Sequence, residues 1–186
     1  MIRHSFGISR SFDRREVEKS RTIPFVFSTG DVDRHNSRLN MAGWDLDGFN
    51  KNGIAGFQHD VYGDNLLSDP NPDLILGPAK AWLEGGVLVG TINFEEPEIN
   101  PLAEKIFRKV LKGTLKAVSV GFIELGKGYT DKDGIYNYSG QELLEISIVS
   151  IPSNKNAIKR AINARALLDD GIDGTYGPNT KAGEVP

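Results

Sequence analysis

Lys116-Ala-Val-Ser-Val-Gly-Phe122 is a short run of strand-forming residues that lies between a helical segment and a Gly-rich turn. Side chains of a strand alternate between its two faces. The bulky face carries Val118, Val120 and Phe122, and the other face carries Ala117, Ser119 and Gly121. The second face is nearly bare, which leaves room for a substrate backbone to lie across Ser119. The same pattern also fits a buried strand at which two layers pack closely.

The length and composition are those of one globular domain with polar ends. A chain of 186 residues can bury a single core, and 39% hydrophobic and 25% charged residues are ordinary values for such a protein. We expect a folded domain over residues 21–168 and a polar N-terminal extension over 1–20. Residues 169–186 have little to bury and are expected to form a flexible tail.

The charge and residue content argue against several kinds of partner and chemistry. A net charge of −3 and a pI near 5.7 give no overall basic field, so nucleic acid is not an expected partner. No apolar run is long enough for a membrane span and no signal peptide is visible, so we expect a cytosolic type of protein without a membrane partner. The absence of cysteine excludes disulfides and a Cys nucleophile.

Short strands dominate the pattern along the chain. Strands are expected within 23–28, 54–59, 74–76, 79–83, 87–94, 116–125 and 143–152, and residues 12–19 fit either a strand or a helix. The clearest helix runs from a capping residue, Asn100, to Gly113, with further helical signals near 44–49 and 156–168. This pattern favours a mainly β, α+β fold, a closed or nearly closed six- to seven-stranded antiparallel β-barrel with outer helices.

Only three histidines are available for a histidine-based mechanism. His4 lies in the polar N-terminal extension, where a solvated side chain is expected. His35 follows Asp31 and Asp33 in a polar loop, which superficially offers metal ligands but has no distant partner of matching pattern. His59 ends a predicted strand, where a rigid scaffold can present a side chain to an active site. A structural role for His59 fits the sequence as well.

Glu145 is a lone carboxylate within the apolar run Leu143-Leu-Glu-Ile-Ser-Ile-Val149. If this run and the strand of Ser119 form one hairpin, its turn lies at Asp131-Lys-Asp-Gly134, and position 132, midway between residues 119 and 145, falls in that turn. Ser119 and Glu145 would then lie nearly opposite each other, about 5 to 8 Å apart. That spacing would admit an imidazole between a serine and an acid. A solvent-facing Glu145 on an edge strand is the alternative.

Five segments, taken in order, resemble the prohead (capsid maturation) proteases of tailed bacteriophages, whose fold is shared by the herpesvirus assemblin proteases. They are Gly30-Asp-Val-Asp-Arg34, Gly43-Trp-Asp-Leu46 with Phe49, Phe57-Gln-His-Asp60, Gly113 to Phe122, and Leu144 to Pro152 with Asn154 and Ala157. The resemblance implies a serine endopeptidase with His59 as general base, Ser119 as nucleophile and Glu145 as third member. Glu145 stands where the herpesvirus enzymes have a second histidine.

The same resemblance suggests where a substrate would be bound. Ser153 and Asn154 would lie near the oxyanion, although the herpesvirus enzymes have arginine there. Ala117 and Gly121 would clear a path for a substrate strand over Ser119.

The implied substrates are the scaffold protein, the scaffolding segment of the major capsid protein and the protease itself. Cleavage would take place inside the assembling prohead, in the cytoplasm of a host that carries the phage or prophage. No cofactor or metal is implied, and a homodimer is compatible with the resemblance. Two other hypotheses remain open: a catalytically silent, scaffold-binding barrel, and a metal-dependent hydrolase built on Asp31, Asp33 and His35.

Overall fold

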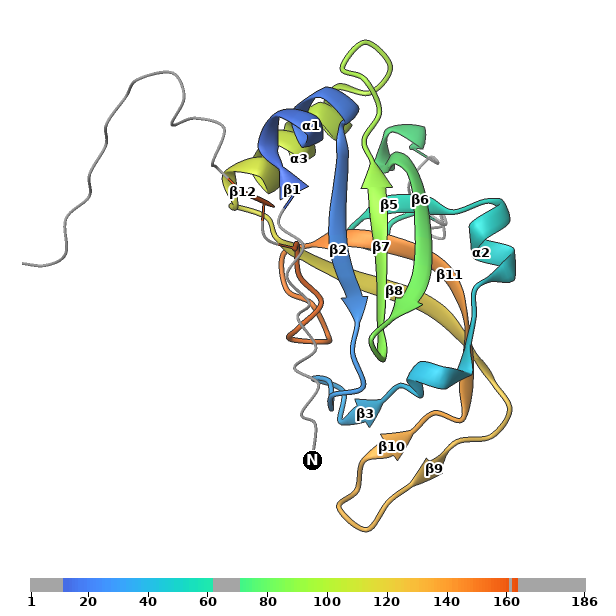
Figure 1. The fold of residues 1–186 in the computed structure, drawn as a ribbon. Coiled ribbons are helices and arrows are strands. Elements are labelled where there is room, and N and C mark those ends of the chain that lie inside the picture. Colours follow the sequence, from blue (N-terminus) through green and yellow to red (C-terminus); the bar gives the residue numbers. More distant parts are fainter. Residues whose placement is uncertain (1–11, 62–70, 161, 164–186) are drawn as a thin grey trace, which may run out of the picture.

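The computed structural model describes residues 12–61, 71–160 and 162–163, and strands predominate among them (Figure 1). The helices are α1 (Arg14–Ser20), α2 (Asp47–Lys51) and α3 (Pro101–Lys112), with 3-10 turns η1 (Met41–Gly43) and η2 (Pro72–Leu74). The strands are β1 (Phe12–Asp13), β2 (Thr22–Ser28), β3 (Ser37–Arg38), β4 (Trp44–Asp45), β5 (Ile54–Phe57), β6 (Ile75–Glu84), β7 (Val87–Asn93), β8 (Ala117–Leu125), β9 (Tyr129–Thr130), β10 (Tyr136–Asn137), β11 (Gly140–Val149) and β12 (Ile162–Asn163). None of the described helices is long and apolar enough to cross a membrane.

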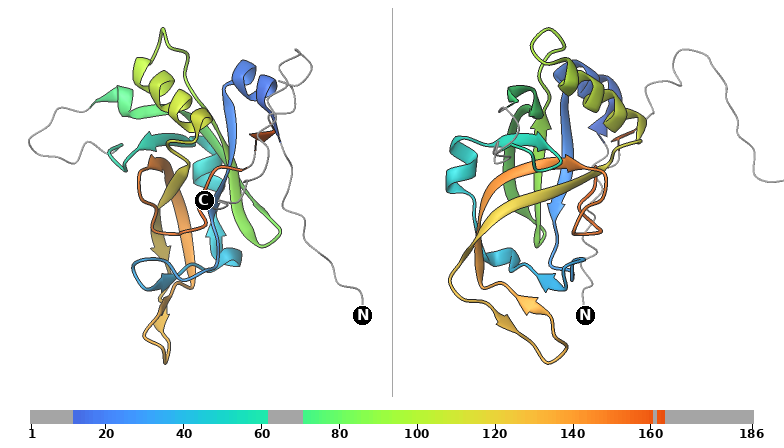
Figure 2. Two further views of the ribbon diagram at one scale, coloured as in Figure 1. Left: turned by 90° about the vertical axis from the view of Figure 1, so that its left-hand side faces the viewer. Right: turned by 180° about the vertical axis from the view of Figure 1, so that it is seen from behind.

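The main sheet has seven strands and curls into an open half-barrel. Its order is β2-β7-β6-β5-β11-β4, with β8 paired to β11. Figures 1 and 2 show β8 and β11 crossing steeply over the layer of β2, β7 and β6, and the hairpin of β9 and β10 extending beyond it. The expected mainly β, α+β class is confirmed, but the closed barrel is not, because the sheet remains open. Nor is it antiparallel throughout, since β11 pairs in parallel with β5 and β4.

The segment 157–160 lies between the two ends of the curled sheet, at β2 and β8. Val26 N–H donates to Ile158 O at 3.0 Å on one side, and Val118 N–H donates to Ala157 O at 3.0 Å on the other. These contacts form isolated bridges rather than a strand. They hold the two edges near each other without closing the sheet.

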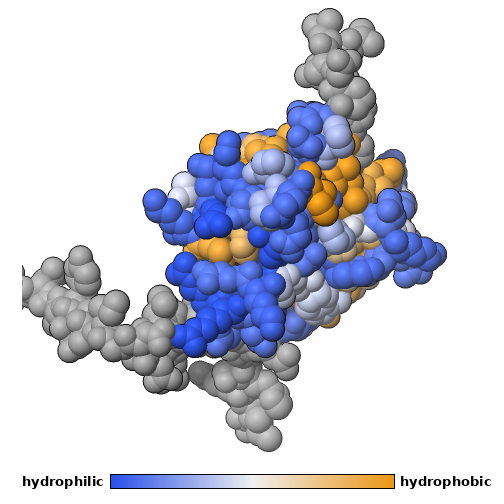
Figure 3. Space-filling view, turned by 90° about the horizontal axis from the view of Figure 1, so that it is seen from above, coloured by the Kyte–Doolittle hydropathy of each residue, from blue (hydrophilic) through white to orange (hydrophobic). Residues whose placement is uncertain are grey.

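Helix α3 begins and ends where the sequence indicates. The Asn100 side chain accepts a hydrogen bond from Ala103 N–H at 2.9 Å, and Gly113 ends the helix with a φ of 82°. The apolar side of α3 is buried in the main core, together with side chains of β2, β7 and β11. Its outer side is charged, and the end of the molecule that carries α1 and α3 is largely hydrophilic (Figure 3).

Several predicted elements differ from the observed ones. The two strands expected within 74–76 and 79–83 are one strand, β6, because Gly77 takes a φ of 142° that lets the chain continue through Pro78. The strand expected over 54–59 ends at Phe57. Residues 156–160 are not helical, since their backbone forms the bridges to β2 and β8. Residues 14–20 of the predicted polar extension form α1, whereas 1–11 and the predicted tail lie outside the described residues.

Candidate active site

Strands β8 and β11 form the predicted hairpin, but with a different register. Ser119 lies opposite Ser147, and Glu145 lies opposite Gly121. The register shifts between Leu143 and Glu145, because a bulge adds a residue to one strand. Glu145 is therefore a diagonal neighbour of Ser119 and not the residue that faces it.

His59 is presented by a tight turn that follows β5, the strand on the other side of β11. Gln58 and His59 have φ values of 58° and 63°, and Asp60 N–H donates to Phe57 O at 3.2 Å. Two consecutive positive φ values are costly for residues other than glycine. The His59 N–H offsets part of this cost by donating to Ser147 Oγ at 3.1 Å. The turn therefore holds the imidazole beside β11.

His59, Glu145 and Ser147 form a chain of hydrogen bonds. His59 Nδ1 lies 2.6 Å from Glu145 Oε1, and Ser147 Oγ donates to Glu145 Oε2 at 2.7 Å. Glu145 is only 1% exposed, and a buried carboxylate is tolerated when its oxygens are paired. An ionised carboxylate can only accept, so Nδ1 of His59 carries the proton in this contact. Nε2 of the neutral ring is then the acceptor.

The hydrogen bond to Glu145 raises the pKa of His59 above its ordinary value of 6.5. The negative charge of Glu145 acts in the same direction, whereas burial of the ring opposes both. The His59 side chain keeps 40% exposure, so protons can exchange with solvent. Raising the pKa of an imidazole strengthens it as a proton acceptor, which suits a general base.

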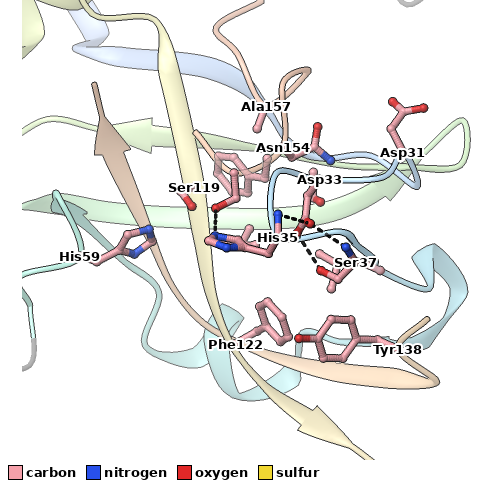
Figure 4. A pocket seen from close by; sticks show the side chains of 15 residues that line it. Asp31, Asp33, His35, Ser37, His59, Ser119, Phe122, Tyr138, Asn154 and Ala157 are labelled. Carbon is pink, nitrogen blue, oxygen red and sulfur yellow. Dashed lines mark hydrogen bonds between the residues drawn. The ribbon is translucent and has the colours of Figure 1, made fainter. Parts of the chain in front are cut away.

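Ser119 and His59 line the same cavity, which has a volume of about 320 Å³. Figure 4 shows Ser119 on β8 and the His59 ring turned toward that strand. Within the described part of the chain the Ser119 hydroxyl has no hydrogen-bond partner, His59 included. Catalytic hydrogen bonds are often long in unliganded sites and tighten in the substrate complex. The serine is thus free to bond to a group brought to it.

Gly121 makes room for the acid of this site. A Cβ at position 121 would lie 2.3 Å from Glu145 Oε1, far inside van der Waals contact. Ala117 forms a bridge with Ile158 and is not among the residues that line the cavity. Gly121 and Ala117 are the two small residues expected to clear a substrate path. Gly121 instead leaves space for the Glu145 carboxylate, and Ala117 pairs with the segment 157–160.

We expect Gly121→Ala to lower kcat/KM by about 10²-fold, because displacing a catalytic group by about 1 Å costs roughly that much. The new methyl group would push the Glu145 carboxylate away from His59 Nδ1. Steady-state kinetics at neutral pH measures the effect. Gly48→Ala is a matched control, since its methyl would meet only the flexible end of Glu142, at 3.1 Å. Equal activity of the two variants would contradict this role of Gly121.

The predicted oxyanion region reaches the same cavity. Ser153 and Asn154 line it together with Ser119 and His59. His35 lines it too, and its Nε2 lies 3.0 Å from Ser153 Oγ (Figure 4).

Asp31, Asp33 and His35 are not arranged as a set of metal ligands. The Asp33 carboxylate accepts hydrogen bonds from the N–H groups of His35 and Ser37, both at 2.9 Å. Figure 4 shows the Asp31 carboxylate turned away from the other two side chains. Among the residues with described positions, no group of three or more His, Cys, Asp and Glu could hold a metal ion.

Ser147 is the site residue that sequence reasoning missed. It contacts both the His59 backbone and the Glu145 carboxylate. The signal was present, because residues 145 and 147 share one face of a strand whose other positions are mostly apolar.

A serine and a histidine that line one cavity, with a buried acid bonded to the histidine, are the groups that serine hydrolases use. Residues 88–167 match the model of the family described as caudovirus prohead serine protease, which supports the resemblance to the prohead proteases. The matched residues include Ser119 and Glu145 but not His59, which the fold brings to them. No curated protein and no solved structure matches the chain, so the expected relation to the herpesvirus assemblins is not confirmed.

Proposed function

We propose that the chain is a serine endopeptidase of the Ser-His-Glu type, with Ser119 as nucleophile, His59 as general base and Glu145 as the acid that orients the base. The observation that carries this proposal is the 2.6 Å contact between His59 Nδ1 and the buried Glu145, at a cavity that Ser119 also lines. The match of residues 88–167 to a serine protease family supports the same reaction.

The reaction begins when Ser119 Oγ attacks the carbonyl carbon of the scissile peptide. A C–O bond forms, the carbonyl π electrons move to oxygen, and Nε2 of His59 takes the serine proton. Glu145 remains ionised and stabilises the imidazolium. The proton then passes to the leaving amine as the C–N bond breaks, which leaves an acyl-enzyme. Water repeats these steps in place of the amine, releases the acid product and restores Ser119.

The tetrahedral intermediate needs donors for its oxyanion. Ser153 and Asn154 are the proposed source, because they line the same cavity as Ser119. Gly121 would serve the site by leaving space for Glu145.

The proposed substrates are the scaffold protein and the scaffolding segment of the major capsid protein, and the protease would also cleave itself. This follows from the family, whose members are described as prohead proteases. The reaction would take place inside the assembling prohead. The catalytic unit would be the domain over residues 21–168.

Co-expression with the major capsid and scaffold proteins tests the function. The wild type is expected to shorten these proteins, whereas Ser119→Ala is expected to leave them intact. Equal processing by both would favour the catalytically silent barrel. Activity that a chelator abolishes and a divalent cation restores would favour the metal-dependent hydrolase, and we expect chelators to have no effect.

The pH dependence of kcat/KM tests the role of Glu145. The base must be neutral, so the wild-type activity should fall as the pH drops through the pKa of His59, which lies above 6.5 because of Glu145. Glu145→Gln removes the main cause of that shift. Its acid limb should therefore move to lower pH, and its kcat should fall about 10⁴-fold since the neutral amide no longer fixes the tautomer or balances the imidazolium. An unchanged acid limb would contradict the assignment.

A further inference from the structure

Arg34 binds the loop that carries Ser153 and Asn154 from outside the cavity. The Arg34 N–H donates to Ser153 O at 3.1 Å, and its guanidinium donates to Pro152 O. One residue therefore holds two consecutive carbonyl oxygens of this loop. Arg34 is not among the residues that line the cavity, whereas Ser153 and Asn154 are.

The carbonyls held by Arg34 fix the direction of two N–H groups. In a planar trans peptide the N–H points opposite to the carbonyl, and no cis peptide occurs in the described chain. The peptide whose carbonyl belongs to Pro152 carries the N–H of Ser153, and the next peptide carries the N–H of Asn154. Both N–H groups therefore point away from Arg34.

These two N–H groups have no acceptor among the described residues. Neither donates a hydrogen bond to any atom of the described residues. Backbone N–H groups are strong donors that protein structures rarely leave unused. Two adjacent ones on a loop at the catalytic cavity form a concave donor pair of the kind that binds an anionic oxygen.

Further contacts restrain the same loop against the segment around Arg34. Asn154 Nδ2 donates to Thr29 O at 3.0 Å, and Asn156 Nδ2 donates to Asp31 Oδ2 at 2.7 Å. The hydrogen bonds from Thr29 and Asn156 also lower the pKa of Asp31, which keeps this acceptor ionised. The loop is thus held in one conformation before substrate arrives.

We infer that Arg34 is a positioning residue for the oxyanion: by holding the carbonyls of Pro152 and Ser153, it aims the N–H groups of Ser153 and Asn154 at the tetrahedral intermediate. This inference rests on the proposed protease function. It assigns to the Asp31–His35 loop a role in catalysis that requires no metal.

Arg34→Ala removes the guanidinium bond to Pro152 O but keeps the backbone bond to Ser153 O, and it tests the inference through transition-state binding. After the cleavage site of the capsid protein has been mapped, a peptide aldehyde that ends at this site forms a hemiacetal with Ser119 and presents an oxyanion. We expect Arg34→Ala to lower kcat by about 10- to 100-fold with little change in KM. The affinity for the aldehyde should fall by the same factor. Binding of the uncleaved peptide should be equal in Ser119→Ala and in Ser119→Ala/Arg34→Ala.

Two variants separate this role from a loss of structure. Arg34→Lys keeps a cationic donor and should recover part of the lost kcat and aldehyde affinity. Arg38→Ala removes a nearby arginine that bonds to Asn137 Oδ1 at 3.1 Å and should leave both quantities unchanged. Unchanged aldehyde affinity in Arg34→Ala, or a rise in KM alone, would overturn the inference. A wild type that neither cleaves the capsid protein nor binds the aldehyde would instead refute the proposed function.

Discussion

Ser119→Ala should reduce kcat by about 10⁴- to 10⁶-fold, the range found when a serine nucleophile is removed from an assembled triad. The hydroxyl has no hydrogen-bond partner within the described part of the chain, so its removal leaves no group unsatisfied. The melting temperature should therefore stay close to that of the wild type. Kinetics on purified capsid or scaffold protein, together with thermal unfolding, measures both effects.

Ser139→Ala is the matched control for this change. Its hydroxyl donates to Leu125 O at 3.0 Å, and it does not line the cavity of Ser119. We expect normal turnover in this variant. If Ser119→Ala kept more than a tenth of the wild-type kcat, Ser119 would not be the nucleophile.

The second large effect is expected for His59→Gln, which should lower kcat by about 10⁴- to 10⁶-fold because an amide cannot take the serine proton. The amide N–H₂ of glutamine can still donate to Glu145, so the buried carboxylate keeps a partner. The fold should thus survive the loss of the base. Single-turnover cleavage at several pH values measures the residual rate. This rate should lack the rise with pH that titration of His59 gives to the wild type.

His59→Ala provides the comparison that separates catalysis from stability. It removes the base as well, but it also takes away the Nδ1 partner of Glu145, which is 1% exposed. Leaving a buried hydrogen-bonding group without its partner costs about 1 to 3 kcal/mol. The two variants should be equally inactive and His59→Ala clearly less stable. Activity within tenfold of the wild type in either variant would rule out His59 as the base.

Local patterns predicted much of the fold. The ends of α3 follow from Asn100 and Gly113, whose capping preferences depend on a few neighbouring residues. The hairpin of β8 and β11 follows from two strand-like runs around turn residues 131–134. The family resemblance added the residues of the site. Residues 88–167 match the model of that family.

Long-range pairing explains what the sequence did not reveal. The parallel pairing of β11 with β5, which brings His59 beside Glu145, joins residues more than 85 positions apart and has no local signature. The bulge before Glu145 shifted the register away from the simple midpoint estimate. The contacts of Arg34 with the loop at 152–153 depend on the placement of backbone carbonyls, which no side-chain pattern encodes.

Labelling with a fluorophosphonate, which phosphonylates an activated serine, tests the central assignment most directly. Peptide mass spectrometry of the labelled protein locates the modified residue. We predict a single adduct on Ser119, formed faster as the pH rises through the raised pKa of His59 and absent in His59→Gln. An adduct on another serine, or none on a protein that cleaves its capsid substrate, would contradict the assignment of Ser119 as the nucleophile.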